Sequence, residues 1–407
     1  MDLNIMNDIS NISPTLQSKL YLQEMRRLGR SVYNFGLGEN PVNQPSFYVD
    51  MLAKHANQKS YTSSEGITPL NDCLKNMYNT ENTKYEVLVG NGLKELLFVV
   101  QSAFKGKIIH VTPSWVSYSE HIDLLDRMDD LIEIKTSIEN DFRINLDVLE
   151  SVLQLHDQEP KMILLNYPNN PTGTCYSNDH LKDIAELLRK YNCMIFADEI
   201  YLNLCYRGDQ RSISEFAPEL TIRATSVSKD FACGGYRIGW CVFPSNLHTF
   251  FETCRNYASR VYSCSAAPIQ YATCELLENK EVCKTYIEKT KQLYQHVIAE
   301  LLPIINKTKL IYPSPSSAWY VFIDFTNYKS ELANLGVYDS IDLSAYLMKN
   351  HNIITVAGQH FRDDSLALRF SLVDFSFDVE TEQFEDLDIE NMKRGFHEMV
   401  SFLSSLS

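Results

Sequence analysis

Short apolar runs alternate with longer amphipathic segments over much of the first 245 residues of the chain. The apolar runs cover residues 86–89, 107–112, 132–136, 161–166, 193–198 and 222–227. Strands that are buried on both faces of a parallel sheet are short and continuously apolar in this way. The segments between them, such as 93–104 and 178–191, have helical periodicity. This alternation predicts a mostly parallel sheet covered by helices.

The pattern changes on either side of this region. Toward the N-terminus it predicts a helix around Ser18–Arg27, then a short strand and a loop rich in Gly and Pro. Toward the C-terminus, a long helical region at about 266–302 precedes two apolar runs at 320–325 and 366–373. These runs predict antiparallel strands with flanking helices, which is an α+β arrangement.

The length of 407 residues is too great for one simple core, so two domains are expected. We assign residues 46–295 to a large α/β domain. Residues 1–45 and 296–407 together form the predicted smaller α+β domain.

Charge and composition narrow the classes of partner. The net charge of −15 disfavours binding to nucleic acid or to an anionic membrane surface. The acidic run at 378–390 has no basic residue and is typical of a solvated loop and helix start rather than a metal site. No window approaches ~18 uninterrupted apolar residues, and the N-terminus lacks the pattern of a signal peptide. We therefore expect a cytoplasmic protein.

The ten cysteines have irregular spacings and form no CxxC pair. Most lie inside apolar runs, as Cys193, Cys205 and Cys241 do. They are expected to be reduced thiols that act as small core residues.

The segment 225–240 places Lys229 after a buried strand, in a loop rich in Ser and Gly, with Arg237 eight positions later. An amine at that end of a strand can form an imine with a carbonyl substrate or an aldehyde cofactor. Ligands bind at the carboxyl ends of strands in open parallel sheets. Taken alone, a lysine in a loop is more often an ordinary surface residue.

A second segment, 196–201, places Asp198 at the end of another apolar run. A poorly solvated carboxylate needs a cationic or donor partner, and a protonated pyridine nitrogen is one such partner. Asp198 could equally cap a helix over the following residues, and both roles are compatible. Tyr201 lies three residues further on and would point its hydroxyl to the same side.

A third segment has the string Asn-Pro-Thr-Gly at 170–173, directly after an apolar run. Together with the Asp-x-x-Tyr of 198–201 and the Ser-x-Ser-Lys of 226–229, it resembles the class I/II aminotransferases that depend on pyridoxal phosphate (PLP). The resemblance extends in order over nearly the whole chain. It implies fold type I: a large domain with a mostly parallel seven-stranded sheet between helices, plus a smaller α+β domain.

The resemblance also implies catalytic roles. Lys229 would form an aldimine with PLP and move the substrate proton, and Asp198 would pair with the pyridine nitrogen. Tyr201 and Asn170 would hydrogen-bond the phenolic oxygen of the cofactor. Trp115, after Pro-Ser at a strand end, sits where the family places an aromatic ring that stacks on the pyridine.

The cofactor phosphate would lie at a Gly-rich turn before a helix, where backbone amides face an anion. The residues implied in phosphate binding are Asn91, Gly92, Leu93, Ser226, Ser228 and Arg237. Tyr61 matches a tyrosine that relatives extend to the phosphate from the other subunit. The resemblance therefore implies a homodimer with shared active sites.

For the substrate, the resemblance assigns the α-carboxylate to Arg369, since a guanidinium fork matches a carboxylate. Gly38 would line the substrate site, and Asn170 would touch the same carboxylate. Arg260 is a candidate for reading a substrate side chain, although an ordinary surface arginine is the simpler interpretation. The identity of the amino donor stays open.

The implied activity is the transfer of an amino group between an L-amino acid and a 2-oxo acid by a ping-pong mechanism. A PLP-dependent lyase of the same fold, acting on β-C–S bonds or resembling aminocyclopropane-carboxylate synthase, is the alternative reading. A PLP-binding module without catalysis is disfavoured because the family-like sequence starts by about residue 30. No metal is expected.

Overall fold

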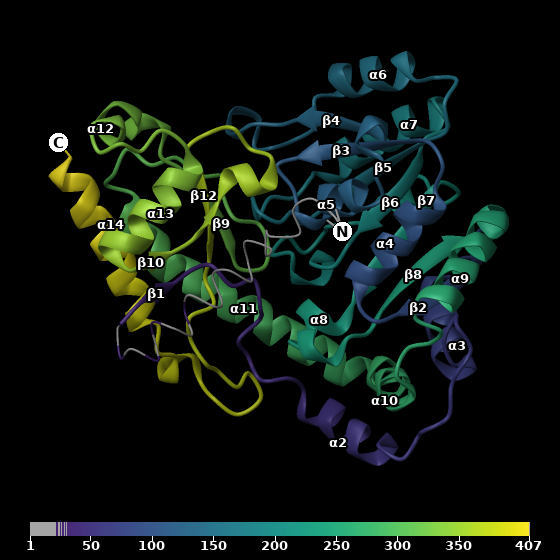
Figure 1. Ribbon diagram of the computed structural model, residues 1–407. Coiled ribbons are helices and arrows are strands. Elements are labelled where there is room, and N and C mark those ends of the chain that lie inside the picture. Colours follow the sequence, from purple (N-terminus) through teal and green to yellow (C-terminus); the bar gives the residue numbers. More distant parts are fainter. Residues whose placement is uncertain (1–21, 23–24, 26, 28, 30, 407) are drawn as a thin grey trace, which may run out of the picture.

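The computed structural model describes residues 22, 25, 27, 29 and 31–406 (Figure 1). The helix expected around Ser18–Arg27 lies for the most part outside the described residues. The described chain contains one large sheet covered by helices and two smaller sheets built from segments near both ends. Figure 1 shows α14 (Glu390–Ser405) at the edge of the molecule opposite α9 (His248–Val261).

The large sheet has seven strands in the order β2-β8-β7-β6-β5-β3-β4. They are β2 (Tyr85–Gly90), β3 (Lys107–Thr112), β4 (Leu131–Lys135), β5 (Lys161–Asn166), β6 (Met194–Asp198), β7 (Thr221–Ser226) and β8 (Gly239–Pro244). β8 pairs antiparallel with both of its neighbours, while the other pairings are parallel. The six predicted strands are confirmed, and the sequence did not identify β8.

Two helical layers cover this sheet because successive strand residues face opposite sides. Ile108 and Phe196 pack in one core with α4 (Leu93–Ala103), α5 (Ser117–Leu124) and α9. Their neighbours Ile109 and Ile195 pack in another core with α6 (Leu146–Leu155) and α7 (Asn178–Lys190). Both faces of the strands are therefore buried, as the continuous apolar runs predicted.

A third core lies beside β2 and β8. It joins α2 (Ser46–His55), α3 (Thr68–Tyr78), α8 (Val227–Asp230) and α10 (Ala267–Glu278). Asn279 lies between α10 and α11 (Lys280–Ile305), and its side chain caps α11 by accepting from the N–H of Val282 at 3.3 Å. The single long helical region expected at 266–302 is therefore two helices, because this cap starts a new one.

The smaller sheet has three antiparallel strands: β9 (Tyr320–Asp324), β11 (Val356–Ala357) and β12 (Ala367–Ser371). A two-stranded parallel sheet joins β1 (Tyr33–Asn34) to β10 (Ile353–Ile354). The helices α12 (Lys329–Ala333), α13 (Ser340–His351) and α14 complete this part. The α+β arrangement is confirmed.

The predicted domain boundary at residues 295/296 falls inside α11, whose side chains join two cores: Leu293 packs with α3, and Leu301 packs with β9. The division into domains stays a prediction. The acidic segment 378–390 is a loop with one 3-10 turn, and α14 begins at Glu390, as expected. Among the described residues, no helix is long and apolar enough to cross a membrane.

Candidate active site

A cavity of about 440 Å³ lies between the large sheet and the smaller one. Asn166, Asp198 and Ser226 end the parallel strands β5, β6 and β7, and all three line this cavity. From the other side the lining includes Gly38 and Arg369. The carboxyl ends of parallel strands therefore meet polar groups from both ends of the chain, which is where open α/β sheets bind ligands.

Lys229 lies in α8, which is a single helical turn rather than the expected loop. The turn forms because the Ser226 side chain accepts a hydrogen bond from the N–H of Ser228 at 3.1 Å. The Lys229 amine lines the cavity and donates to the carbonyl of Gly38. It also lies 5.6 Å from the ring centre of Trp319. A primary amine is thus held at the cavity wall by neutral partners.

Asp198 is 3% exposed. Its Oδ2 accepts a hydrogen bond of 2.6 Å from the Tyr118 hydroxyl, and its Oδ1 accepts from the N–H of Ile200 at 3.2 Å. Burial raises its pKa from 3.8 to about 6, while the bond from Tyr118 acts in the opposite direction. The following residues form a turn, so Asp198 caps a turn and not the helix considered from the sequence.

Tyr201 is buried, and its hydroxyl is 2.9 Å from that of Tyr320. Burial raises the pKa of Tyr201 well above its usual value. The Tyr320 hydroxyl also approaches the carbonyl of Gly38 at 3.5 Å. A hydroxyl pair therefore connects the end of the large sheet to the smaller one at the cavity.

Arg369 is only 1% exposed and has no carboxylate partner among the residues that the structure describes. It donates to Asn170 Oδ1 at 3.0 Å and to the carbonyl of Gly36 at 2.8 Å, and its Nε has no partner in the described chain. The rings of Tyr320 and Phe361 lie 4.8 and 5.1 Å from its guanidinium carbon. Burial lowers its pKa. A buried guanidinium without a counter-ion suits an anionic ligand.

At the opposite end of the cavity, Leu93 begins α4 and Gly92 precedes it with φ +88°. A Cβ at Gly92 would lie 2.5 Å from Arg237 Nη2, so only glycine allows the arginine this close. Arg237 donates to the carbonyls of Asn91 and Gly234 at 3.1 and 2.8 Å. Together with Ser226 and Ser228 in the lining, Arg237 forms a corner of the cavity that carries hydroxyl donors and a positive charge and would suit an anion.

The sequence predicts that the N–H of Asn91 faces the cofactor phosphate. In the structure this N–H donates to Glu95 Oε2 at 2.9 Å instead. Neither Asn91 nor Gly92 is part of the cavity lining. Trp115 does line the cavity, and the amine of Lys94 lies 5.4 Å from its ring centre. The first turn of α4 therefore brings Leu93 and the cationic side chain of Lys94 to the cavity.

Two predicted residues lie outside the lining. Tyr61 is 95% exposed, and Arg260 is an exposed residue in the last turn of α9. Neither contributes to the cavity of its own chain.

Sequence reasoning missed several lining or supporting residues, among them Tyr118, Tyr320, Asn166 and Lys94. Asn166 had a readable signal, since it ends the same apolar run that precedes Asn-Pro-Thr-Gly. The contacts of Tyr118 and Tyr320 join residues 80 and 119 positions apart, and no local pattern reveals such pairs.

Comparisons with known proteins agree on one family. A model described as aminotransferase class I and II matches residues 30–374. The asparagine–oxo-acid transaminase of Streptococcus mutans is 27% identical over 370 residues, covering 86% of this chain and 89% of that protein. The aspartate/prephenate aminotransferase of Thermus thermophilus is 29% identical over 311 residues, covering 74% and 78%.

The fold is shared with solved structures. An aspartate aminotransferase from Thermus thermophilus with maleate has a TM-score of 0.82 at 24% identity, over 98% of this chain and 100% of that one. Fold type I is thereby confirmed, and the family names favour transamination over the lyase alternative.

The cavity also has the groups that PLP requires. It offers an amine at Lys229, a buried carboxyl at Asp198, and an arginine with two serines at the corner around Arg237, and these groups would suit the aldehyde, the ring nitrogen and the phosphate of PLP. The match over residues 30–374 and this donor set lead to one conclusion: the chain belongs to the class I and II aminotransferase family and is a PLP-dependent transaminase.

Proposed function

We propose that the amino donor is an acidic amino acid, with aspartate as the first candidate, and that Lys94 binds its side-chain carboxylate. The cationic side chains of the cavity must balance the anionic groups of the cofactor and the substrate. The lining contains four cationic side chains: Lys94, Lys229, Arg237 and Arg369.

Any PLP-dependent transamination needs groups that bind the cofactor phosphate, bind the substrate α-carboxylate and move the α-proton, and three of these cations suit those roles. Arg237, at the corner with Ser226 and Ser228, balances the cofactor phosphate. Arg369 binds the α-carboxylate that donor and acceptor share, because its Nε and fork are free of carboxylates in the described chain. Lys229 would hold the cofactor through its amine and act as the base that moves the substrate α-proton.

When bound, PLP supplies an electron sink that stabilises negative charge at the α-carbon. Asp198 would keep the pyridine nitrogen protonated, and the hydrogen bond from Tyr118 favours the ionised form of Asp198. Tyr201 and Asn170 would donate to the phenolic oxygen, and Trp115 would stack on the ring. Gly38 contributes backbone to the substrate side of the cavity.

Lys94 is the remaining cation. It is exposed at the first turn of α4, and it has no carboxylate partner among the described residues. A compact ammonium group is a good match for a flexible side-chain carboxylate. The names of the relatives support this assignment, since several are called aspartate aminotransferases. An exposed Glu39 at the same cavity would reduce binding of longer acidic side chains by repulsion.

A homodimer with shared active sites is part of this proposal. Tyr61 exposes 95% of its surface in the single chain, although a large aromatic side chain is ordinarily covered. In a dimer, Tyr61 of the partner subunit would reach the phosphate corner. Sedimentation of wild type and Tyr61→Phe, with PLP affinity measured on both, tests this: a dimer with weaker PLP binding in the variant is expected. A monomeric wild type contradicts it.

The substrate proposal is tested by single-turnover half-reactions. The PLP form is mixed in turn with aspartate, glutamate, asparagine and phenylalanine, and formation of the pyridoxamine form is followed by absorbance. We expect aspartate to react fastest. Lys94→Met should lower kcat/KM for aspartate about 10–100-fold and that for phenylalanine less than about threefold, because only the first loses a charge contact.

Lys182→Met is the matched control, because Lys182 is exposed on α7 and pairs only with Glu186. An equal loss with aspartate and phenylalanine in Lys94→Met would show that Lys94 does not read the side chain. Release of pyruvate or ammonia instead of the pyridoxamine form would contradict transamination itself.

A further inference from the structure

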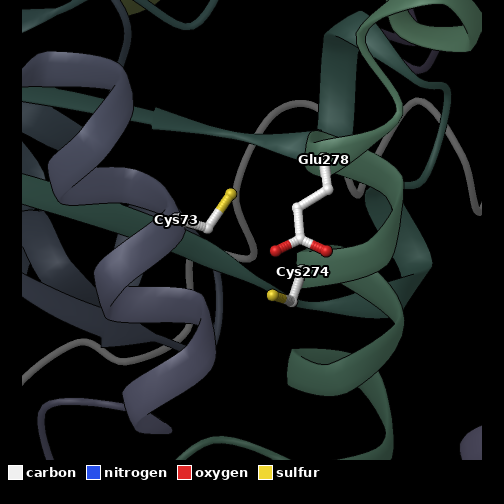
Figure 2. A group of neighbouring side chains, drawn as sticks. All are labelled: Cys73, Cys274 and Glu278. Carbon is white, nitrogen blue, oxygen red and sulfur yellow. The ribbon is translucent and has the colours of Figure 1, made fainter.

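Three potential metal ligands lie together on the face of the molecule where α3 meets α10. Figure 2 shows Cys73 pointing from α3 toward Cys274 and Glu278 on α10. The two thiol sulfurs and a carboxylate oxygen all lie within 4.8 Å of one another. This group is separate from the cavity described above, whose lining includes none of the three.

The helical spacing explains why the group forms. Cys274 and Glu278 are four residues apart on α10, so their side chains lie on one face, one turn from each other. α3 packs against that face, and Cys73 is the residue of α3 that faces the pair. Two ligands from one helix and a third from its neighbour form a chelating arrangement.

We propose that Cys73, Cys274 and Glu278 form a binding site for one zinc-class divalent cation. In a tetrahedral zinc site with sulfur ligands at about 2.3 Å, ligand atoms lie about 3.8 Å apart. The present separations need only side-chain adjustments of about an ångström to reach that geometry. Thiolate ligands select zinc or cadmium over magnesium or calcium, which prefer oxygen.

The ligands are both available and reachable. Cys73 and Cys274 are free cysteines, and Glu278 has no ion-pair or hydrogen-bond partner among the described residues. Glu278 is exposed and Cys73 is half-buried, so a cation can enter from solvent. Cys283 lies in the same core cluster and donates to the carbonyl of Leu276 at 3.1 Å. Because the Cys283 thiol is engaged in this way, a water completes the fourth position.

The cation would strengthen a connection that the chain already has. On the same face of α10, Gln270 accepts from the N–H of Ile67 at 2.8 Å and donates to the Thr62 hydroxyl at 3.0 Å. Gln270, Cys274 and Glu278 follow one another at intervals of four residues. Gln270 thus holds the segment before α3 against α10, and a bound metal would hold α3 itself there through Cys73.

The test uses the PLP-loaded enzyme under a phosphine reductant, after removal of metals with a chelator. Cadmium is titrated while the ultraviolet thiolate-to-metal charge-transfer band is recorded, and bound zinc is counted by mass spectrometry after gel filtration. We expect one metal per chain and a rise in thermal stability on binding. Absence of the thiolate band in the wild type would overturn the proposal.

Variants locate the site. Cys73→Ser and Cys274→Ser each remove one of the two thiolates, so each should weaken the band and reduce zinc binding by more than the roughly 10–100-fold that loss of an outer-shell partner causes. Glu278→Gln should keep the band but weaken binding, and because Glu278 is exposed this variant should fold normally. PLP content confirms that each variant is folded.

Cys264→Ser is the matched control, because Cys264 is a half-buried free cysteine outside the cluster. It should bind cadmium and zinc as the wild type does. Loss of the band in Cys264→Ser, or its full retention in both Cys73→Ser and Cys274→Ser, would place the metal elsewhere and refute the assignment.

Discussion

The Tyr118 hydroxyl donates a 2.6 Å hydrogen bond to Oδ2 of Asp198, and both side chains are buried. Burial raises the pKa of Asp198 to about 6, and the bond from Tyr118 opposes that rise. The tyrosine therefore favours the ionised carboxylate that a pyridinium needs as its partner. Tyr118 is therefore a positioning residue for Asp198, although it lies outside the sequence motif that contains Asp198.

Replacing Tyr118 with Phe should raise the pKa of Asp198 further, since only the hydroxyl is lost. A hydrogen bond to a charged group contributes about 1.5–3 kcal/mol, so PLP affinity at neutral pH should fall about ten- to hundredfold. The deficit should shrink as the pH rises, because Asp198 then ionises without help. Equilibrium titration of PLP into the cofactor-free protein at several pH values measures this effect.

Tyr286→Phe is the control for that experiment, because the buried Tyr286 hydroxyl donates to the carbonyl of Asn43 at 2.6 Å, away from the cavity. A similar loss of PLP affinity in both variants would indicate a packing effect rather than control of Asp198.

Lys229→Ala should remove the covalent attachment of PLP that borohydride fixes, and transamination should fall about ten-thousandfold or more. Lys229→Arg keeps a positive charge but has no amine of suitable basicity, so it should fail in the same way. Mass spectrometry of the reduced protein locates the adduct. A cofactor adduct that persists on another lysine would show that Lys229 was wrongly assigned.

Arg369→Lys should raise KM for amino donor and oxo acid alike by about 10–100-fold, because both present the same carboxylate to the lost guanidinium fork. Steady-state kinetics in which both substrate concentrations are varied gives the two KM values. Arg260→Lys, on the exposed end of α9, should change neither value. If Arg260→Lys raised KM for acidic donors alone, Arg260 would have to contact the substrate side chain.

Asp230 gives a prediction about pH and stability. This buried neighbour of Lys229 has an Oδ1 without a partner among the described groups, and burial raises its pKa from 3.8 to about 7. A raised acid pKa means that its contribution to stability is complete below the unfolded pKa and is lost as pH rises through about 7.

Asp230→Asn cannot ionise and keeps an acceptor for the 2.7 Å bond from Asn203. Relative to the wild type it should therefore gain stability as pH rises from about 4 to about 8, by on the order of 4 kcal/mol for a shift of roughly three pKa units. Chemical denaturation of both proteins across this range checks it. The buried His110 and His121 titrate in both proteins, so the difference isolates Asp230. A constant difference would mean that Asp230 stays in one protonation state.

Much of the site was predictable because its motifs lie at the ends of strands. Asp198 closes β6, and Lys229 follows β7 by three residues. Neighbouring parallel strands end at one edge of the sheet, so a strand assignment by periodicity already brings these two residues together. The resemblance then supplied the roles that periodicity cannot give.

The parts that were missed depend on contacts between distant segments. Nothing near Tyr118 in the sequence indicates that its hydroxyl meets a carboxyl 80 positions later. The engagement of the Asn91 amide by Glu95 was not anticipated either, although both lie in the same turn. It depends on a side-chain rotamer, and a sequence pattern does not specify rotamers.

The pairing of β1 with β10 bears on how the protein is made. Tyr33 is opposite Ile353, a separation of 353 − 33 = 320 positions. At roughly 5–20 residues per second, a ribosome needs about 16–64 seconds to supply the partner of the first strand. The cavity has the same requirement, since it takes Gly38 from the early chain and Arg369 from the late chain. The nascent polypeptide thus supplies all strands of its large sheet first, and the cavity is complete only after Arg369 has been synthesised.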